Sequence, residues 1–206
     1  MASFLGEYSG CAKNRVEKFH RAVESFISQE YANKELIIVS DGCPITITES
    51  RKYYTNTQIY VWAVEKQPMF SGNVRQYGLE KATGDIVCYL DTDDYFGKNH
   101  LVSIVSSFTH NPDNKWIYYN DKIIYALHPM TMTEWISTER QVNVRSGEIG
   151  SSSIAHRRLE TVNWSGCDGY GHDWTFVNRL NSQFPNPQKI NGAEYYVCHI
   201  PMTADV

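Results

Sequence analysis

Apolar residues in the first half of the chain recur in two alternating patterns. Short continuous runs, such as residues 36–39, are typical of buried strands. Between them, apolar residues three or four positions apart, such as Val16, Phe19 and Val23, are typical of a helix with one buried face. The predicted elements are a strand over 2–8, a helix over 15–31, strands over 35–42 and 58–66, a helix over 73–84, a strand over 85–91 and a helix over 100–114. Strands that alternate with helices favour a largely parallel sheet with right-handed crossovers, which is an α/β fold.

The pattern changes in the second half of the chain. The predicted elements there are a hairpin over 115–127 that turns at Asn120 and Asp121, a mobile loop over 145–159, a helix over 171–180 and a last strand over 193–201. The loop is expected because its sequence is polar and rich in Gly and Ser. The chain contains no internal repeat and no low-complexity linker, so we expect a single domain over residues 1–206.

Composition and charge narrow the class of protein. The chain of 206 residues is 42% hydrophobic with a net charge of −4, as in ordinary globular proteins. No block of like charge favours nucleic acid as a partner, and no apolar run approaches the roughly 20 residues that span a bilayer. The amino-terminal residues lack the basic and long apolar parts of a secretory signal. The five cysteines are scattered and form no CxxC pair, which indicates reduced thiols in a soluble cytoplasmic protein without a zinc site.

The densest group of acidic residues follows the apolar run at 86–90. Asp91, Asp93 and Asp94 repel one another unless a cation or water lies among them. Mg2+ and Mn2+ bind one or two carboxylates together with phosphates and waters, whereas a solvated turn is the alternative. Asp41 ends another predicted strand. Because ligands of open α/β sheets bind beyond the carboxyl ends of the strands, Asp41 and Asp91 indicate one crevice.

Two segments of the chain resemble glycosyltransferase family 2. SFISQEYANKELIIVSDG, at 25–42, is similar to the family's opening, a helix ending S-x-x-x-Q-x-Y before a strand ending in Asp-Gly. VRQYGLEKATGDIVCYLDTDD, at 74–94, resembles its R-N-x-G-x-x-x-A-x-G block followed by L-D-x-D-D, the DXD motif. The resemblance covers residues 2–110 and the rest loosely. It implies the GT-A fold, with a Rossmann-like, mostly parallel sheet flanked by helices, a nucleotide-sugar donor, and Mn2+ or Mg2+ as cofactor.

The resemblance also implies roles for residues in the nucleotide-binding half. Tyr8 would border the nucleobase, Asp41 would hydrogen-bond the base, most often uracil, and Arg75 would approach the nucleotide. Asp91 would contact the ribose or reach the metal through water. Asp93 would ligate the metal that bridges the diphosphate. From the residues alone, a core position for Tyr8 and a helix-surface position for Arg75 stay open.

A late segment, GYGHDW at 169–174, resembles the family's G-x-E-D-W element, which carries the catalytic base. The matching base is Asp173, and His172 stands where the family has Glu. A helix N-cap is the alternative for Asp173. Some GT-A enzymes complete their metal site with a late histidine, which here would be His199. A core or surface histidine is the alternative for that residue.

Other departures from the family pattern lie near the expected nucleobase contacts. Ser40 replaces the first acid of the family's Asp-Asp pair, Gln76 replaces the Asn after the Arg, and CPITIT follows Asp41-Gly42. These changes affect the base contacts more than the metal site.

The implied function is a metal-dependent, inverting transfer of a sugar from a nucleotide-sugar, with a UDP-sugar favoured, to a hydroxyl of a glycan or glycoprotein acceptor. Residues 1–110 would bind the donor, and residues 111–206 would hold the acceptor and the catalytic base. One alternative is a sugar-nucleotide pyrophosphorylase, whose Gly-rich loop with Arg and Lys is poorly matched by GEYSGCAKNR. The other is a non-catalytic sugar-nucleotide-binding domain.

Overall fold

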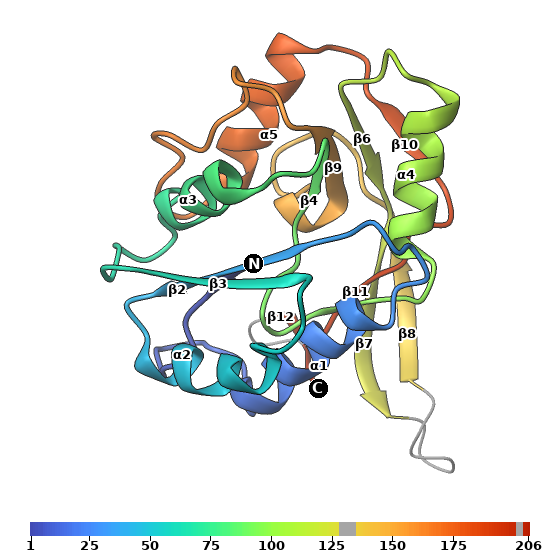
Figure 1. The fold of residues 1–206 in the computed structure, drawn as a ribbon. Helices are drawn as coiled ribbons and strands as arrows, with labels where there is room; N and C mark the ends of the chain where they lie inside the picture. The colour runs from blue at the N-terminus through green and yellow to red at the C-terminus, as the bar shows by residue number, and fades with distance from the viewer. Residues whose placement is uncertain (128–134, 201–203) are drawn as a thin grey trace.

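Three parallel strands form the first sheet of the protein. The computed structural model describes residues 1–127, 135–200 and 204–206. In the first sheet, β2 (Leu36–Asp41) lies between β1 (Ala2–Ser3) and β3 (Ile59–Val64). The connections carry α1 (Arg15–Ile27), α2 (Pro44–Ser50) and a 3-10 turn, Arg51–Tyr53. Figure 1 shows α1 and α2 on one side of this sheet and α3 (Asn73–Lys81) on the other.

The second sheet is mixed, in the order β10-β6-β9-β4. Its strands are β10 (Gln188–Ile190), β6 (Trp116–Tyr119), β9 (Ile154–Arg157) and β4 (Ile86–Cys88). β9 runs antiparallel to both β6 and β4, whereas β10 and β6 are parallel. The sheet thus joins strands from both sides of residue 110. Helices α4 (His100–His110) and α5 (His172–Gln183) pack beside it (Figure 1).

A third sheet has the order β5-β11-β7-β8. Its strands are β5 (Tyr95–Phe96), β11 (Tyr195–Val197), β7 (Asp121–Leu127) and β8 (Trp135–Arg140). A short antiparallel pair, β12 (His199–Ile200) and β13 (Ala204–Asp205), follows β11. The third sheet matters for the site because β5 directly follows the acidic residues, and β11 brings residues from late in the chain beside it.

Two large apolar cores and a small cluster of Ile37, Val39 and Val74 hold these elements together. The larger core includes Phe19, Ile38 and Ile104, all about fully buried, between α1, β2 and α4. The second core lies under α5, where the rings of Trp164 and Phe176 stack with centroids 4.0 Å apart. The site described below lies at the edge of this second core. Buried side chains of the core hold α5, whose first residues contribute to the site.

Two predictions about the second half of the chain are wrong. Residues 115–127 are not a hairpin, because β6 pairs with β9 and β10 while β7 pairs with β8 and β11. Residues 145–159 are not simply a loop, because they contain a 3-10 turn, Ser151–Ser153, and the buried strand β9. Two of the four residues of β9 are polar, and a tertiary partner satisfies the buried one: His156 Nε2 lies 2.7 Å from the Tyr89 hydroxyl.

Candidate active site

Arg75 and Asp91 meet at the carboxyl end of β4. Arg75 lies in the first turns of α3, and its Nη2 donates to Asp91 Oδ1 at 3.1 Å. The Arg75 side chain is 15% exposed, and its guanidinium lies 5.2 Å from the Trp164 ring. Burial lowers the pKa of Arg75, but the carboxylates of Asp173 and Asp91 outweigh this and hold that pKa above its usual value. Arg75 is therefore a fixed positive charge between two carboxylates.

His172, the first residue of α5, links Arg75 to the base candidate. Its Nε2 accepts a hydrogen bond from Arg75 Nη1 at 3.1 Å, and its Nδ1 donates to the Gly169 carbonyl at 3.2 Å. This pattern assigns the neutral ring with the proton on Nδ1. Burial lowers the pKa of His172, which agrees with a neutral ring. The histidine thus orients the guanidinium by accepting its hydrogen bond.

Asp173 is the second residue of α5, and it faces this group. Its Oδ1 lies 3.5 Å from His172 Nε2 and is a buried oxygen without a hydrogen-bond partner among the described residues. The N-cap position belongs to Gly171, whose φ of 94° suits a glycine, and no side chain caps the helix. The capping alternative for Asp173 therefore has no support, and the carboxylate is left with a lone pair that can take a proton.

The remaining acids after β4 differ sharply from one another. Asp94 is buried and accepts hydrogen bonds from the Tyr195 hydroxyl at 2.9 Å and from the Cys198 amide at 2.8 Å. Burial, reinforced by Asp93 and Asp91, raises the pKa of Asp94 well above its usual value. The Asp93 carboxylate is half-buried and accepts no hydrogen bond from the described residues, whereas its backbone carbonyl accepts one from Arg21. Asp93 is thus available to a ligand and Asp94 is not.

Tyr195 is a residue that the sequence analysis missed. Its hydroxyl accepts a hydrogen bond from the Asp91 amide at 3.0 Å and donates to Asp94. It fixes the backbone of the acidic loop from β11, which lies about a hundred residues later in the chain. A tyrosine in an apolar strand gives no sequence signal for this role.

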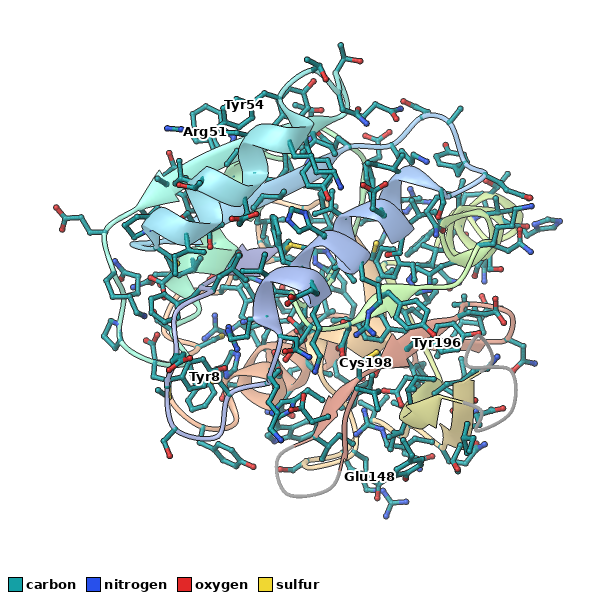
Figure 2. All side chains as sticks on the ribbon, turned by 90° about the horizontal axis from the view of Figure 1, so that it is seen from below. Tyr8, Arg51, Tyr54, Glu148, Tyr196 and Cys198 are labelled. Carbon is teal, nitrogen blue, oxygen red and sulfur yellow. The ribbon has the colours of Figure 1, made fainter. Side chains whose placement is uncertain are left out.

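Asp41 is the last residue of β2, and Tyr8 lies on the loop that follows β1. Asp41 accepts hydrogen bonds from Lys66 Nζ at 2.6 Å and from the Gln67 amide at 2.7 Å. Tyr8 is 37% exposed, and Arg15 lies 4.9 Å from its ring. In Figure 2 Tyr8 lies toward the periphery, on the loop after β1. Tyr8 therefore does not lie in the core, which was the alternative position considered from the sequence.

His199 does not join the other candidate metal ligands in this structure. Its Nε2 lies 3.0 Å from the Gly10 carbonyl and its Nδ1 lies 3.3 Å from Asp205 Oδ1. Across residues 1–127, 135–200 and 204–206, no three His, Cys, Asp or Glu side chains gather in a group that could hold a metal ion.

Other sequence expectations concern helices and cysteines. In the described part of the chain, no helix has both the length and the apolar character needed to cross a membrane. All five cysteines are free thiols. Glu148 accepts a hydrogen bond from Asn143, forms an ion pair with Arg145, and lies at the outer edge of the molecule in Figure 2.

Comparison with known proteins places these features in a family. Residues 11–158 match the profile of the family described as "Glycosyl transferase family 2". The chain is 32% identical over 81 residues to the uncharacterized glycosyltransferase YibD of Escherichia coli (strain K12), a match that covers 39% of this chain and 24% of that protein. It is 27% identical over 116 residues to the amylovoran biosynthesis glycosyltransferase AmsB of Erwinia amylovora, which covers 53% of this chain and 38% of that protein. The chain spans well under two thirds of either relative.

Solved structures support the same assignment at the level of the fold. The crystal structure of S. aureus TarS 1-349 superposes with a TM-score of 0.69 at 17% identity, covering 89% of this chain and 57% of that one. The same protein in complex with UDP-GlcNAc gives a TM-score of 0.64 at 16% identity, covering 89% and 55%. The profile match over most of the chain, together with this shared architecture, shows that the chain belongs to glycosyltransferase family 2 and has the GT-A fold.

Proposed function

We propose that the chain transfers a sugar from a nucleotide-sugar donor to an acceptor hydroxyl, with Asp173 as general base. The observation that carries this proposal is the convergence of Asp173, Arg75, Asp91 and His172 on one charged group beyond β4. A general base needs a free lone pair close to the reacting proton. The buried, unpartnered Oδ1 of Asp173 has that lone pair.

A UDP-sugar is the favoured donor. Structures of TarS contain UDP and UDP-GlcNAc, and this chain shares their fold. Arg75 would offset the negative charge that develops on the diphosphate as the glycosidic bond breaks. Asp41 and Tyr8 would border the base, although Asp41 would have to share its present partners, Lys66 and the Gln67 amide, with the nucleotide.

A single general base favours a one-step displacement in which the configuration of the transferred sugar is inverted. A base that takes the acceptor proton on the face opposite the leaving group gives in-line attack, the geometry that distinguishes inverting from retaining chemistry in glycosidases. Asp173 is the one carboxylate of the HDW segment, since His172 is neutral and engaged with Arg75 and Gly169. The proposed acceptor is a glycan or glycoconjugate hydroxyl.

A divalent cation, Mn2+ or Mg2+, fits the acidic end of β4. The unpartnered carboxylate of Asp93, with Asp91 beside it, is the kind of donor set that binds such an ion together with diphosphate oxygens. When bound, the ion supplies positive charge against the leaving diphosphate. His199 would join as a ligand only by giving up one of its contacts, that of Nε2 with Gly10 or that of Nδ1 with Asp205.

The deciding experiment measures transfer and donor binding on the same preparations. UDP-, GDP- and TDP-sugars are incubated with Mn2+ and a set of glycan acceptors, and nucleoside diphosphate release is followed. Asp173→Asn should lower turnover roughly 100- to 10,000-fold while donor binding is kept, because the amide cannot accept the proton. Asp113→Asn, an exposed position after α4, is the matched control and should be unchanged.

Near-normal turnover in Asp173→Asn would overturn the base assignment. Donor binding without turnover or hydrolysis in the unaltered protein would instead favour the non-catalytic binding domain. Release of pyrophosphate from a nucleoside triphosphate and a sugar phosphate would favour the pyrophosphorylase.

A further inference from the structure

Two aromatic side chains are exposed together on the surface beside the candidate active site. Tyr170 is 97% exposed, the largest fraction among the exposed large apolar side chains of the described residues, and Phe70 is 42% exposed. The centroids of the two rings lie 6.0 Å apart, and the ring planes meet at 83°. Because burial of an aromatic ring is strongly favourable, two neighbouring rings left in water indicate a surface that binds a ligand.

This aromatic pair, Phe70 and Tyr170, lies next to the proposed base. The Phe70 ring stacks on the ring of His172, with centroids 5.7 Å apart and 24° between the planes. His172 Nε2 in turn lies 3.5 Å from Asp173 Oδ1, the buried oxygen without a partner among the described residues. A molecule that covers the aromatic pair therefore lies within reach of the proposed base.

The aromatic pair comes from two loops, one before α3 and one before α5, and hydrogen bonds join these loops. Ser71 Oγ donates to Asp168 Oδ1 at 2.9 Å, and the Gly72 amide donates to the Cys167 carbonyl at 2.8 Å. A Cβ at Gly72 would lie 2.6 Å from that carbonyl oxygen, so the loops pack too closely there for a larger residue. The two loops thus present the rings as one surface.

The backbone at and around the aromatic pair takes the left-handed conformation. Phe70 has a φ of 60°, which is costly for a bulky side chain. The other two non-glycine residues with positive φ in the described part of the chain are asparagines, which adopt it more readily. Tyr170 lies between two glycines whose φ values are 78° and 94°. Strained residues cluster where ligands bind, so the strain at Phe70 agrees with a binding role for its ring.

The polar groups around the aromatic pair favour a sugar over a lipid chain. One face of a sugar ring carries C–H groups that pack on an aromatic ring, and its hydroxyl groups need hydrogen-bond partners. Asp168 is exposed at the junction of the two loops, and its Oδ2 accepts no hydrogen bond from the residues that the structure describes. That oxygen can accept from sugar hydroxyls. Beside an alkyl chain it would lose water without gaining a partner.

We propose that the aromatic pair is the binding site for the acceptor, and that the acceptor presents a sugar ring there. The C–H face of this ring lies against Tyr170, Phe70 borders one side, and Asp168 binds hydroxyl groups of the ring. Another hydroxyl of the bound sugar then lies near Asp173. The inference rests on the proposed function, which assigns Asp173 as the base.

Saturation-transfer difference NMR measures sugar binding directly, without the need for transfer. The probes are the methyl β-glycosides of glucose, galactose and N-acetylglucosamine, with UDP and Mn2+ present and absent, and octyl phosphate as a lipid-like probe. At least one glycoside should bind the unaltered protein through the protons of one ring face. Tyr170→Ala should weaken this binding about tenfold, because the stacking face is lost. Tyr170→Phe should keep the affinity within about twofold, since the ring face remains.

Tyr54→Ala is the matched control, because Tyr54 is 56% exposed and follows the 3-10 turn Arg51–Tyr53 (Figure 2). It should bind the glycosides as the unaltered protein does. The melting temperature should be unchanged in each variant, since the substituted side chains are exposed. Equal glycoside affinity in Tyr170→Ala and Tyr54→Ala would overturn the proposal. So would the failure of every glycoside to bind, or tighter binding of octyl phosphate than of the glycosides.

Donor binding and transfer separate this inference from the proposed function. UDP affinity should be the same in Tyr170→Ala and in the unaltered protein, and a weaker affinity would move the aromatic pair to the donor site and overturn the proposal. Transfer with an unchanged acceptor KM in Tyr170→Ala would overturn the inference and leave the proposed function intact. Absence of transfer with every donor would overturn the proposed function, whereas glycoside binding that depends on Tyr170 would still support a sugar site at the pair.

Discussion

At the scale of single residues, Arg75 connects the parts of the site. Its two terminal nitrogens bond different partners, Asp91 and His172, and its flat face lies over Trp164. This use depends on the planar fork of the guanidinium, which an ammonium group lacks. Charge alone therefore does not account for the choice of arginine here.

Arg75→Lys should weaken binding of UDP with Mn2+ about 10- to 100-fold, although the charge is kept, because at least one of the two oriented hydrogen bonds is lost. Isothermal titration calorimetry measures this loss. Arg51→Lys, an exposed position labelled in Figure 2, is the matched control and should bind UDP normally. Equal affinity in the two variants would show that only the charge of Arg75 matters.

Neighbouring aspartates should respond oppositely to removal of the carboxylate. Asp93→Ala should abolish the metal-dependent part of UDP binding and leave the melting temperature unchanged, since the carboxylate accepts no hydrogen bond from the described residues. UDP titrations with and without Mn2+ measure the first effect. Unchanged affinity in the presence of Mn2+ would remove Asp93 from the metal site.

Asp94→Ala should lower the free energy of unfolding instead. It leaves the Tyr195 hydroxyl and the Cys198 amide without their acceptor in a buried place, at a cost of about 1–3 kcal/mol for each unsatisfied group. Urea denaturation measures the loss. Stability equal to that of Asp93→Ala would contradict the structural role of Asp94.

At the scale of elements, a chain of hydrogen bonds through the second core holds β9 in place; we call it the relay, and it consists of Trp164, Tyr89 and His156. Trp164 Nε1 donates to the Tyr89 hydroxyl at 3.0 Å, and that hydroxyl lies 2.7 Å from His156 Nε2. His156 Nδ1 in turn lies 2.8 Å from the Arg157 carbonyl. Each of these buried polar atoms therefore has a partner, which is the condition for a strand with a buried histidine to lie inside a sheet.

Tyr89→Phe should destabilise the protein by about 1–3 kcal/mol, because it leaves both the Trp164 N–H and His156 Nε2 unpaired without opening a large cavity. Urea denaturation gives the free energy of unfolding. Tyr60→Phe, at an exposed position of β3, is the matched control and should change stability little. Similar stabilities of the two variants would argue against the relay.

The relay also explains which elements could be predicted from the sequence. Helix α1 and strand β2 follow from the spacing and continuity of apolar residues, which depend on local geometry. Strand β9 could not be predicted, because its burial depends on Tyr89 and Trp164, which are distant in sequence. The supposed hairpin at 115–127 failed for a related reason: alternation identifies strands, but it does not say with which sheet each one pairs.

The candidate site shows the same division. The acidic run after an apolar strand made Asp91 and Asp93 candidates, and the resemblance of GYGHDW to the family's G-x-E-D-W element made Asp173 one. The different environments of Asp93 and Asp94 could not be predicted, because the partners of Asp94 come from β11 and the residue after it.

At the scale of the whole molecule, two buried histidines link folding to pH. Burial lowers the pKa of His100 to about 3 and that of His156 to about 4, against roughly 6.5 in an unfolded chain. Below pH 6.5 the unfolded chain therefore binds protons that the folded protein does not. As the pH falls below 6.5, the free energy of unfolding should decrease by up to about 1.4 kcal/mol per pH unit for each histidine. The raised pKa of Asp94 acts in the opposite direction and offsets part of the loss.

Urea denaturation at pH 7.5, 6 and 5 measures this slope. His100→Phe keeps a flat ring against Phe96, whose centroid lies 4.1 Å away, but does not titrate. The variant should therefore lose less stability between pH 6 and pH 5 than the unaltered protein. An unchanged slope would mean that His100 takes up its proton without unfolding.

The hydrogen bonds from Tyr195 and Cys198 to Asp94 also determine when the acidic loop can take its final conformation during protein synthesis. Ribosomes release a chain from its amino end, so residues 91–94 emerge about a hundred residues before the groups that fix them. Until then, like-charged carboxylates lack these two hydrogen-bond donors, and their repulsion keeps the loop from settling. A nascent chain can thus complete its first sheet early, but it cannot arrange its acidic loop until β11 has left the ribosome.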